Sequence, residues 1–269
     1  MKAIVTGAHG MLGTDLMHIL RLQYDVFGCD LDNCDILDDK QVEQVVSAYR
    51  PDVIIHAAAY TNVDQAETDK DLAMQVNATG TMHVAAAAQK YQAKFVYLST
   101  DYVFDGTKTT LYTEEDLPHP LGVYAESKVC GERHVQQMFA HVNQNAPGYL
   151  IIRTAWLYGK HGKNFVTTIL QLAREQGHLR VVHDQTGSPT YTKDLVRGLL
   201  ALLDRKATGI FHVTNDGSCT WYEFARTILE LAGMSQIPVQ PITTQELHLP
   251  APRPKFSASL SIPRVLRRP

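Results

Sequence analysis

A glycine-rich turn near the start of the chain constrains its fold more than any other feature. Gly7, Gly10 and Gly13 stand in "TGAHGMLG", directly after the apolar run "KAIVT" and at the opening of the amphipathic "MLGTDLMHILRL". Glycines let a backbone turn tightly and approach a ligand closely, and the free N–H groups at a helix N-terminus favour a bound phosphate. The order of strand, glycine turn and helix predicts the first βα turn of a nucleotide-binding sheet.

Apolar runs and helical patterns alternate along the rest of the chain. Strands this apolar, separated by helices, call for a parallel sheet covered on both faces. We therefore predict an α/β fold with a doubly wound, Rossmann-like parallel sheet. The further strands expected are "YDVFGCD", "PDVIIHAAA", "AKFVYLS", "GYLIIRTAW", "LRVVHD" and "GIFHVTN", and the helices are "DKQVEQVVSAYR" and residues 69–90, 123–141, 163–177, 192–204 and 220–233.

The length of the chain allows a main domain with a smaller appendage. Its 269 residues, 45% of them hydrophobic, can bury a sizeable core. We predict that residues 1–155 form the dinucleotide-binding domain, that elements from 156–235 return to it, and that 156–269 contribute a smaller C-terminal substrate lobe. The proline-rich "IPVQPITTQELHLPAPRPK" is expected to be irregular and to pack over the carboxyl edge of the sheet.

Composition excludes several classes of partner. The formal net charge of -3 gives no general attraction to nucleic acid or to an anionic membrane. We find neither a signal-peptide pattern nor an apolar run of membrane-spanning length, so we expect a cytoplasmic protein. The cysteines Cys29, Cys34, Cys130 and Cys219 lack CxxC spacing and are interpreted as ordinary thiols of a reducing compartment. The twelve histidines contain no HExxH motif.

Asp30 ends the second predicted strand, where an acidic residue can accept hydrogen bonds from the ribose hydroxyls of an adenine nucleotide. A glycine-rich turn that binds nothing is the alternative for the glycines alone, but Asp30 favours dinucleotide binding. A 2'-phosphate would face this carboxylate, and the adjoining "LDNCD" offers no Arg. The residue thus favours NADH, with NADPH left open because distant residues could supply a positive charge.

Three further residues form a candidate catalytic set. Tyr124 and Lys128 in "VYAESK" lie on one face of a predicted helix, where an ammonium would lower the tyrosine pKa toward a value useful for proton transfer. The same lysine can hold the nicotinamide ribose. Thr100 ends the strand "KFVYLS" and can donate a hydrogen bond to a substrate carbonyl. Surface packing of the Tyr-Lys pair and a strand-end role for Thr100 are the alternatives, and the order of the three elements favours catalysis.

At this point the sequence resembles a known family. The glycine turn, "HAAAYTNVDQAE", "VNATGT", Thr100, Tyr124 and Lys128 resemble the extended short-chain dehydrogenase/reductase superfamily. Within it, the stretches "STDYVFDG", "RTAWLYG", "DQTGSPTYTKDL" and "PAPRPKFSASL" are most similar to the dTDP-4-dehydrorhamnose reductases. Family members usually continue past "RPKFSASL" with a further helix, whereas this sequence ends at Pro269.

The resemblance implies a reaction and roles for the catalytic set. The 4-keto group of a dTDP-linked 4-dehydro-6-deoxy-L-mannose would be reduced with NADPH or NADH, giving dTDP-L-rhamnose for cell-surface polysaccharide. Tyr124 would donate the proton, Lys128 would tune it and bind ribose, and Thr100 would hold the carbonyl.

The resemblance also implies two sets of binding residues. Trp156 could equally be a core residue, and Arg253, which would bind the nucleotide diphosphate, could equally be a surface charge. The cofactor set is Gly7, Gly10, Met11, Leu12, Gly13, Asp30, Asp35, Ile36, Ala59, Tyr60, Thr61, Asn77, Ser99, Tyr124 and Lys128. The substrate set is Thr100, Asp101, Tyr102, Trp156 and Arg253.

Assembly and metal binding follow from the same resemblance. Some members form metal-dependent dimers through acidic side chains, one of them on the first helix, where this chain has Asp15. The other acidic partners are not evident, so we predict no metal, and a homodimer stays open.

Two other functions compete with the reductase. A nucleotide-sugar dehydratase needs a second carboxylate after the catalytic threonine, whereas here Asp101 is followed by Tyr102. Another nucleotide-sugar reductase or epimerase stays open. A non-catalytic module, similar to the regulatory subunit of methionine adenosyltransferase, would not need Thr100, Tyr124 and Lys128 together. The sequence therefore favours an enzyme.

Overall fold

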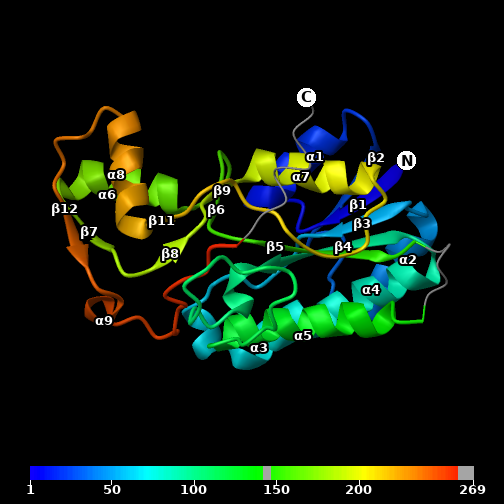
Figure 1. Cartoon of the computed structure of the whole chain (residues 1–269). Coiled ribbons are helices and arrows are strands. Elements are labelled where there is room, and N and C mark those ends of the chain that lie inside the picture. Colours follow the sequence, from blue (N-terminus) through cyan, green and yellow to red (C-terminus); the bar gives the residue numbers. More distant parts are fainter. Residues whose placement is uncertain (142–146, 260–269) are drawn as a thin grey trace.

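The computed structural model describes residues 1–141 and 147–259 and has a parallel sheet at its centre (Figure 1). Within those residues the sheet has six strands in the order β10-β5-β4-β3-β1-β2, all parallel. The chain runs from β1 outward to β2 and then returns to build the other half from β3, so the strand order reverses beside β1. Ligands of doubly wound sheets bind at such a reversal. The strands are β1 (Lys2–Thr6), β2 (Asp25–Cys29), β3 (Val53–His56), β4 (Lys94–Thr100), β5 (Tyr149–Thr154) and β10 (Gly209–His212).

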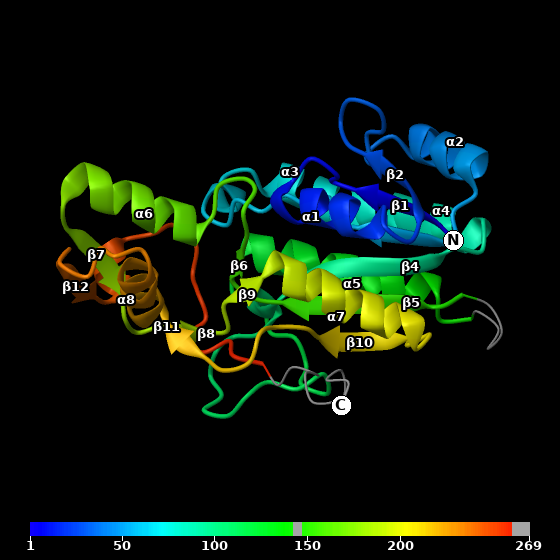
Figure 2. The same ribbon diagram turned by 90° about the horizontal axis from the view of Figure 1, so that it is seen from above.

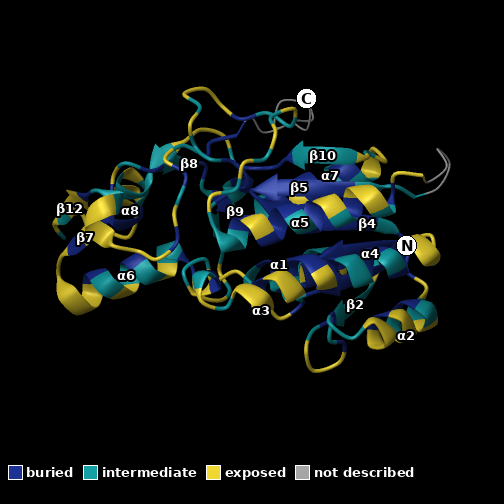
Figure 3. Cartoon of the chain, turned by 90° about the horizontal axis from the view of Figure 1, so that it is seen from below, coloured by how far each residue is buried: buried dark blue, intermediate teal, exposed yellow. Residues whose placement is uncertain are grey.

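Helices cover both faces of this sheet (Figure 2). Alternate residues of a strand point to opposite faces; Ala3 and Val5 belong to one buried cluster, whereas Ile4 belongs to the other. The first cluster includes α1 (Met11–Leu20) and α7 (Thr192–Asp204), and the second includes α2 (Asp39–Tyr49), α4 (Thr81–Lys90) and α5 (Val123–Met138). The inner strands β1, β3, β4 and β5 are buried between these layers, whereas the edge strands β2 and β10 are mostly half-buried (Figure 3). The predicted doubly wound α/β fold is confirmed.

The single helix predicted for residues 69–90 is wrong in detail. It consists of α3 (Lys70–Met74), a π-helical segment (Gln75–Gly80) and α4, and a 3-10 turn (Gln65–Glu67) precedes it. The buried Asn77 lies in the π-helical segment, where its side chain accepts from the Tyr60 N–H at 2.8 Å and donates to Ser127 Oγ at 2.9 Å. Single widened turns are often found at functional sites.

Other predicted elements are longer than those in the structure. The helix predicted for 123–141 ends at Met138, and the strand predicted from "GYLIIRTAW" ends at Thr154. Trp156 has a positive φ of 46°, which takes the chain out of the sheet.

Part of the chain beyond Trp156 forms a smaller lobe, at the left of Figure 1. Its core joins α6 (Phe165–Gln176), β7 (Leu179–Val182) and α8 (Trp221–Leu231). The strand "LRVVHD" was expected in the main sheet, but β7 pairs with β12 (Val239–Ile242) in a separate sheet. The proline-rich segment predicted to be irregular thus contains β12 and also α9 (Thr244–Leu247). Short strands complete the elements: β6 (Leu157–Tyr158), β8 (Thr186–Gly187), β9 (Thr190–Tyr191) and β11 (Cys219–Thr220).

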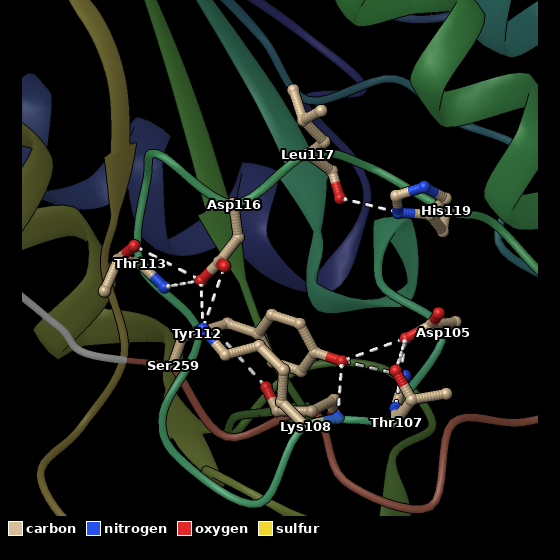
Figure 4. A network of polar contacts seen from close by, with 11 residues as sticks. Asp105, Thr107, Lys108, Tyr112, Thr113, Asp116, Leu117, His119 and Ser259 are labelled. Carbon is tan, nitrogen blue, oxygen red and sulfur yellow. Dashed lines mark hydrogen bonds and ion pairs between the residues drawn. The ribbon is translucent and has the colours of Figure 1, made fainter.

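A long segment between β4 and α5 is joined to the end of the described chain. After a 3-10 turn (Asp101–Val103), the Tyr112 hydroxyl donates to Asp105 Oδ1 at 3.1 Å, and Lys108 Nζ lies 2.6 Å from Asp116 Oδ2 (Figure 4). The Tyr112 N–H donates to the Ala258 carbonyl at 3.0 Å. The C-terminal segment therefore packs against the residues that follow β4.

A buried ion pair ties α5 to β5. Arg153 donates from Nε and Nη2 to Glu132 at 2.9 and 2.7 Å, and both side chains are 3% exposed. Ser99 Oγ also donates to Glu132 Oε1 at 2.5 Å. A buried ion pair of this kind is costly to break from one side.

We predict that Arg153→Met lowers the free energy of unfolding by about 3–5 kcal/mol, because it leaves the Glu132 carboxylate buried without its partner. Lys90→Met removes the exposed ion pair of Lys90 with Glu43 and should cost at most about 1 kcal/mol. Urea unfolding of both variants, with Arg153→Met/Glu132→Gln as a partial rescue, checks the difference. Equal losses for the two single variants would contradict the prediction.

Candidate active site

A cavity of about 950 Å³ lies at the carboxyl edge of the sheet. Its wall comes from the ends of β1, β2, β3, β4 and β5, the start of α5, and the lobe residue Trp221. This is the crevice beside the reversal of strand order, where open α/β sheets bind their ligands.

The glycine turn forms one end of the cavity through close backbone contacts. A Cβ on Gly13 would lie 2.0 Å from the Gly7 carbonyl oxygen, and one on Gly7 would lie 2.7 Å from the Ala58 nitrogen. Gly7 also has a φ of 66°, which favours glycine. No side chain caps α1 at Gly10, and the first turn of α1 lines the cavity. The turn can therefore receive a phosphate on backbone N–H groups.

The Asp30 carboxylate is partly used by the protein itself. Its Oδ2 accepts from the His9 N–H at 2.9 Å, and its Oδ1 accepts from the Leu31 N–H at 3.0 Å. His9, a loop residue that the sequence interpretation missed, places its ring Nδ1 3.9 Å from Asp30 Oδ2. Its position inside "GAHG" was the available signal. The Asp30 carboxylate is therefore hydrogen-bonded by the backbone, and an imidazole ring stands beside it.

Most of the predicted cofactor set lines this one cavity. Asn77 is the exception, because it does not line the cavity. Its side chain hydrogen-bonds to the backbone N–H and carbonyl of Tyr60, and Tyr60 does line the cavity. The predicted residues that line it are Gly7, Gly10, Met11, Leu12, Gly13, Asp30, Asp35, Ile36, Ala59, Tyr60, Thr61, Ser99, Tyr124 and Lys128.

Thr100, Tyr124 and Lys128 are brought together at the same cavity. The expected lowering of the Tyr124 pKa is wrong for this structure: removal from water raises the pKa of Tyr124 to about 12, although a hydrogen bond with Thr100 acts in the opposite direction. Lys128 is 2% exposed, and burial lowers its pKa to about 7, while Glu132 raises it. Lys128 Nζ donates to the Leu98 carbonyl at 2.7 Å. Burial thus outweighs the attraction that the sequence interpretation assumed.

Asp101 connects the catalytic threonine to the C-terminal segment. Its Oδ1 accepts from Thr100 Oγ1 at 3.1 Å, and its Oδ2 accepts from Ser257 Oγ at 2.5 Å. Burial raises the pKa of Asp101 to about 6, although these hydrogen bonds lower it. Tyr102 lines a small adjoining cavity, and its ring lies edge-on to that of Tyr124 at 6.0 Å.

Two tryptophans form the wall nearest the smaller lobe. Trp156 and Trp221 stack with ring centroids 3.4 Å apart, and both line the cavity. A Cβ on Gly187 would lie 2.4 Å from the Trp156 ring, so only glycine leaves room for the stack. The sequence interpretation missed Trp221, which begins α8 immediately after the helix cap Thr220 and carried no recognised motif.

Arg253 is held by a carboxylate in this structure. It donates from Nη1 and Nη2 to the two oxygens of Asp64, at 3.0 and 2.7 Å. It lies outside the residues that line the large cavity. Its predicted contact with a diphosphate stays a prediction.

One cluster in the described part of the chain has the donor types of a metal site. One ligand atom each of Asp15, His18 and His161 lies within 4.8 Å of the others, and Thr192 Oγ1 donates to Asp15 Oδ2 at 2.6 Å. Our expectation that the chain binds no metal stays a prediction.

We predict that Lys128→Met raises the free energy of unfolding, by an amount that depends on pH. The unfolded lysine binds its proton up to about pH 10.5 and the folded one only to about 7, so the cost of Lys128 is greatest below pH 7 and falls by about 1.4 kcal/mol per pH unit above it. Unfolding at pH 7 and pH 9 should show the gap between variant and wild type narrowing. Lys90→Met, at an exposed lysine, is the control, and a gap that does not change with pH would refute the assignment.

The fold and the site together define a dinucleotide-dependent oxidoreductase of the short-chain dehydrogenase type. The family model described as RmlD substrate binding domain matches residues 1–266, and the chain belongs to this family. None of the helices in the described residues is long and apolar enough to cross a membrane.

Individual relatives are similar over nearly the whole chain. The spore coat polysaccharide biosynthesis protein SpsK of Bacillus subtilis is 40% identical over 95% of this chain and 88% of its own. A dTDP-4-dehydrorhamnose reductase of Aggregatibacter actinomycetemcomitans is 38% identical over 95% and 89%. The crystal structure of dTDP-4-dehydrorhamnose reductase from Bacillus anthracis in complex with NADP superimposes with a TM-score of 0.92, at 44% identity over 97% of this chain and 90% of that one.

Proposed function

We propose that the chain reduces the 4-keto group of dTDP-4-dehydro-6-deoxy-L-mannose with NADPH or NADH, yielding dTDP-L-rhamnose for cell-surface polysaccharide. The observation that carries the proposal is the meeting of Thr100, Tyr124 and Lys128 with the glycine turn in one cavity. The family, and relatives named dTDP-4-dehydrorhamnose reductase, support the substrate class.

The glycine turn fits a dinucleotide. Side chains at Gly7 or Gly13 would fill the space where the backbone turns, and the first turn of α1 opens onto the cavity. Met11 and Leu12 would hold the pyrophosphate on backbone N–H groups, with Gly10 beside them, whose own N–H donates to the Gly7 carbonyl. The nicotinamide, when bound, supplies the hydride.

The catalytic residues would manage the proton and the developing charge. With a pKa of about 12, Tyr124 keeps its proton at neutral pH and so acts as the acid rather than starting as a phenolate. Its hydroxyl would pass the proton to the carbonyl oxygen as negative charge develops there. The Thr100 hydroxyl, which donates to Asp101 in this structure, would turn its proton to that oxygen and hold it beside the donor.

Lys128 would act on the cofactor side. Its Nζ is anchored to the Leu98 carbonyl, which leaves its other donors for ribose hydroxyls. An arriving pyrophosphate and the phenolate formed after proton transfer would both favour the charged lysine.

The choice between the two cofactors is set near Asp30. The relative from Bacillus anthracis was solved with NADP, and the Asp30 carboxylate here accepts two backbone N–H groups instead of standing free. We therefore propose that NADPH is accepted as well as NADH.

The substrate would lie between the sheet and the smaller lobe. The stacked Trp156 and Trp221 offer an apolar wall for the sugar or the base, and Asp101 and Tyr102 stand beside Thr100. We retain Arg253 as the candidate for the diphosphate, which would then compete with Asp64. Residues 156–269 as a substrate lobe, a homodimer and a cytoplasmic location are parts of the same proposal.

We predict that the wild-type chain oxidises NADPH or NADH in the presence of dTDP-4-dehydro-6-deoxy-L-mannose and that Tyr124→Phe lowers kcat by about 10²–10⁴-fold, because the proton donor is lost. The cofactor Kd should change little. Nicotinamide absorbance measures turnover, and fluorescence titration measures binding. Tyr222→Phe, at a tyrosine of the smaller lobe that lines a separate pocket, is the matched control.

The alternative, a non-catalytic regulatory module, predicts a different result for nicotinamide oxidation. A non-catalytic module would bind nucleotide without turnover, in the wild type as in Tyr124→Phe. Turnover that survives in Tyr124→Phe would instead show that another group supplies the proton.

We further predict that Thr100→Val lowers kcat by about 10²-fold with little change in KM, because the hydroxyl acts on charge that develops only in the transition state. Thr100→Ser keeps the hydroxyl and should recover most of the rate. Steady-state kinetics decide the point: a rise in KM alone would assign Thr100 to substrate binding only.

A further inference from the structure

Two cysteines lie side by side in the wall of the cavity, where the proposed mechanism gives them no role. Cys29 is the last residue of β2, and Cys34 follows the turn that carries Asp30. They are 2% and 4% exposed, both have free thiols, and both line the cavity.

Hydrogen bonds of the turn bring the second cysteine back to the first. The Cys34 N–H donates to the Asp30 carbonyl at 2.8 Å, and the Asn33 side chain donates to the Gly28 carbonyl at 3.0 Å. Both cysteines belong to the same buried cluster. The interaction between the two thiols lowers the pKa of the Cys34 thiol and raises that of the Cys29 thiol.

We propose that Cys29 and Cys34 are an oxidation site at which a peroxide forms a disulfide, and that this modification weakens dinucleotide binding. The effect on binding rests on the proposed function, because it places the adenosine part of the cofactor at this wall. The formation of the disulfide does not depend on it.

The chemistry needs one peroxide and two steps. The Cys34 thiolate attacks an oxygen of hydrogen peroxide, the O–O bond breaks, and hydroxide leaves to give a sulfenic acid. The sulfur of Cys29, losing its proton, then attacks the Cys34 sulfur; the S–O bond breaks, the S–S bond forms, and water leaves. Two thiols are oxidised by two electrons, and one peroxide is reduced to two waters.

A disulfide would affect dinucleotide binding because the turn between the two cysteines carries Asp30. Asp30 lies between the two cysteines and accepts the His9 N–H of the glycine turn. A disulfide requires specific sulfur and Cβ geometry, so closing it moves the turn and with it the contact between Asp30 and the glycine turn. Asp30, which would bind the ribose, and the glycine turn, which would bind the pyrophosphate, are then displaced together.

The test treats the reduced protein with hydrogen peroxide and maps the product. We expect intact mass to show the loss of two hydrogens, and peptide mapping to show a link between Cys29 and Cys34. NADPH titration should give a Kd raised by about ten-fold or more, equivalent to 1.4 kcal/mol, and dithiothreitol should restore it. Cys34→Ser should bind NADPH before and after peroxide alike.

The other cysteines supply the matched control. Cys130 in α5 and Cys219 in β11 stand on separate elements, and a Cys130→Ser/Cys219→Ser variant should respond to peroxide like the wild type. A sulfinic acid on one cysteine with no linked peptide would overturn the proposal, as would a linked peptide with an unchanged Kd. Failure of the reduced protein to bind NADPH would overturn the proposed function as well, whereas binding without turnover would count against that function alone.

Discussion

The contact of backbone on backbone at the glycine turn is the constraint on which the rest of the site depends. Gly13 in α1 lies against the Gly7 carbonyl, and Gly7 lies against Ala58 beyond β3, at distances that no Cβ could tolerate. These contacts bring the start of α1 down to the sheet between β1 and β3. The Asp30 carboxylate then holds the same turn from the β2 side. The glycine turn is therefore held in place by the ends of β1, β2 and β3 without any ligand.

Burial gives the catalytic groups protonation states that differ from those of the free side chains. The same removal from water raises the pKa of Tyr124 to about 12 and lowers that of Lys128 to about 7. The phenol is neutral at pH 7, and the lysine is close to its pKa, so a bound anion can change the protonation state of the lysine. The buried His56 is hydrogen-bonded to Thr6 and Thr81. Burial lowers its pKa to about 3, so at neutral pH it adds no positive charge near Lys128.

The sequence predicted the fold because the apolar strands and the glycine turn are local patterns. The doubly wound sheet was predicted from the alternation of strands and helices along the chain, and the gathering of Thr100, Tyr124 and Lys128 from their places in that order and from the family resemblance. What could not be predicted were contacts between distant residues, such as the stack of Trp156 on Trp221 and the pairing of Arg253 with Asp64. The direction of the Tyr124 pKa was also missed, because it depends on burial from several elements rather than on the nearby lysine.

The segment 251–259 returns to the catalytic region from the far end of the chain. Ser257 donates to Asp101, Arg253 pairs with Asp64, and Phe256 and Ser259 bridge to Thr186 and Tyr112. During synthesis on the ribosome, the sheet and the dinucleotide cradle have all their strands once β10 has emerged, some forty residues earlier. The nascent chain can thus form its nucleotide pocket before segment 251–259 is available, and the Asp101 side chain gains its hydrogen bond from Ser257 only after that segment has been translated.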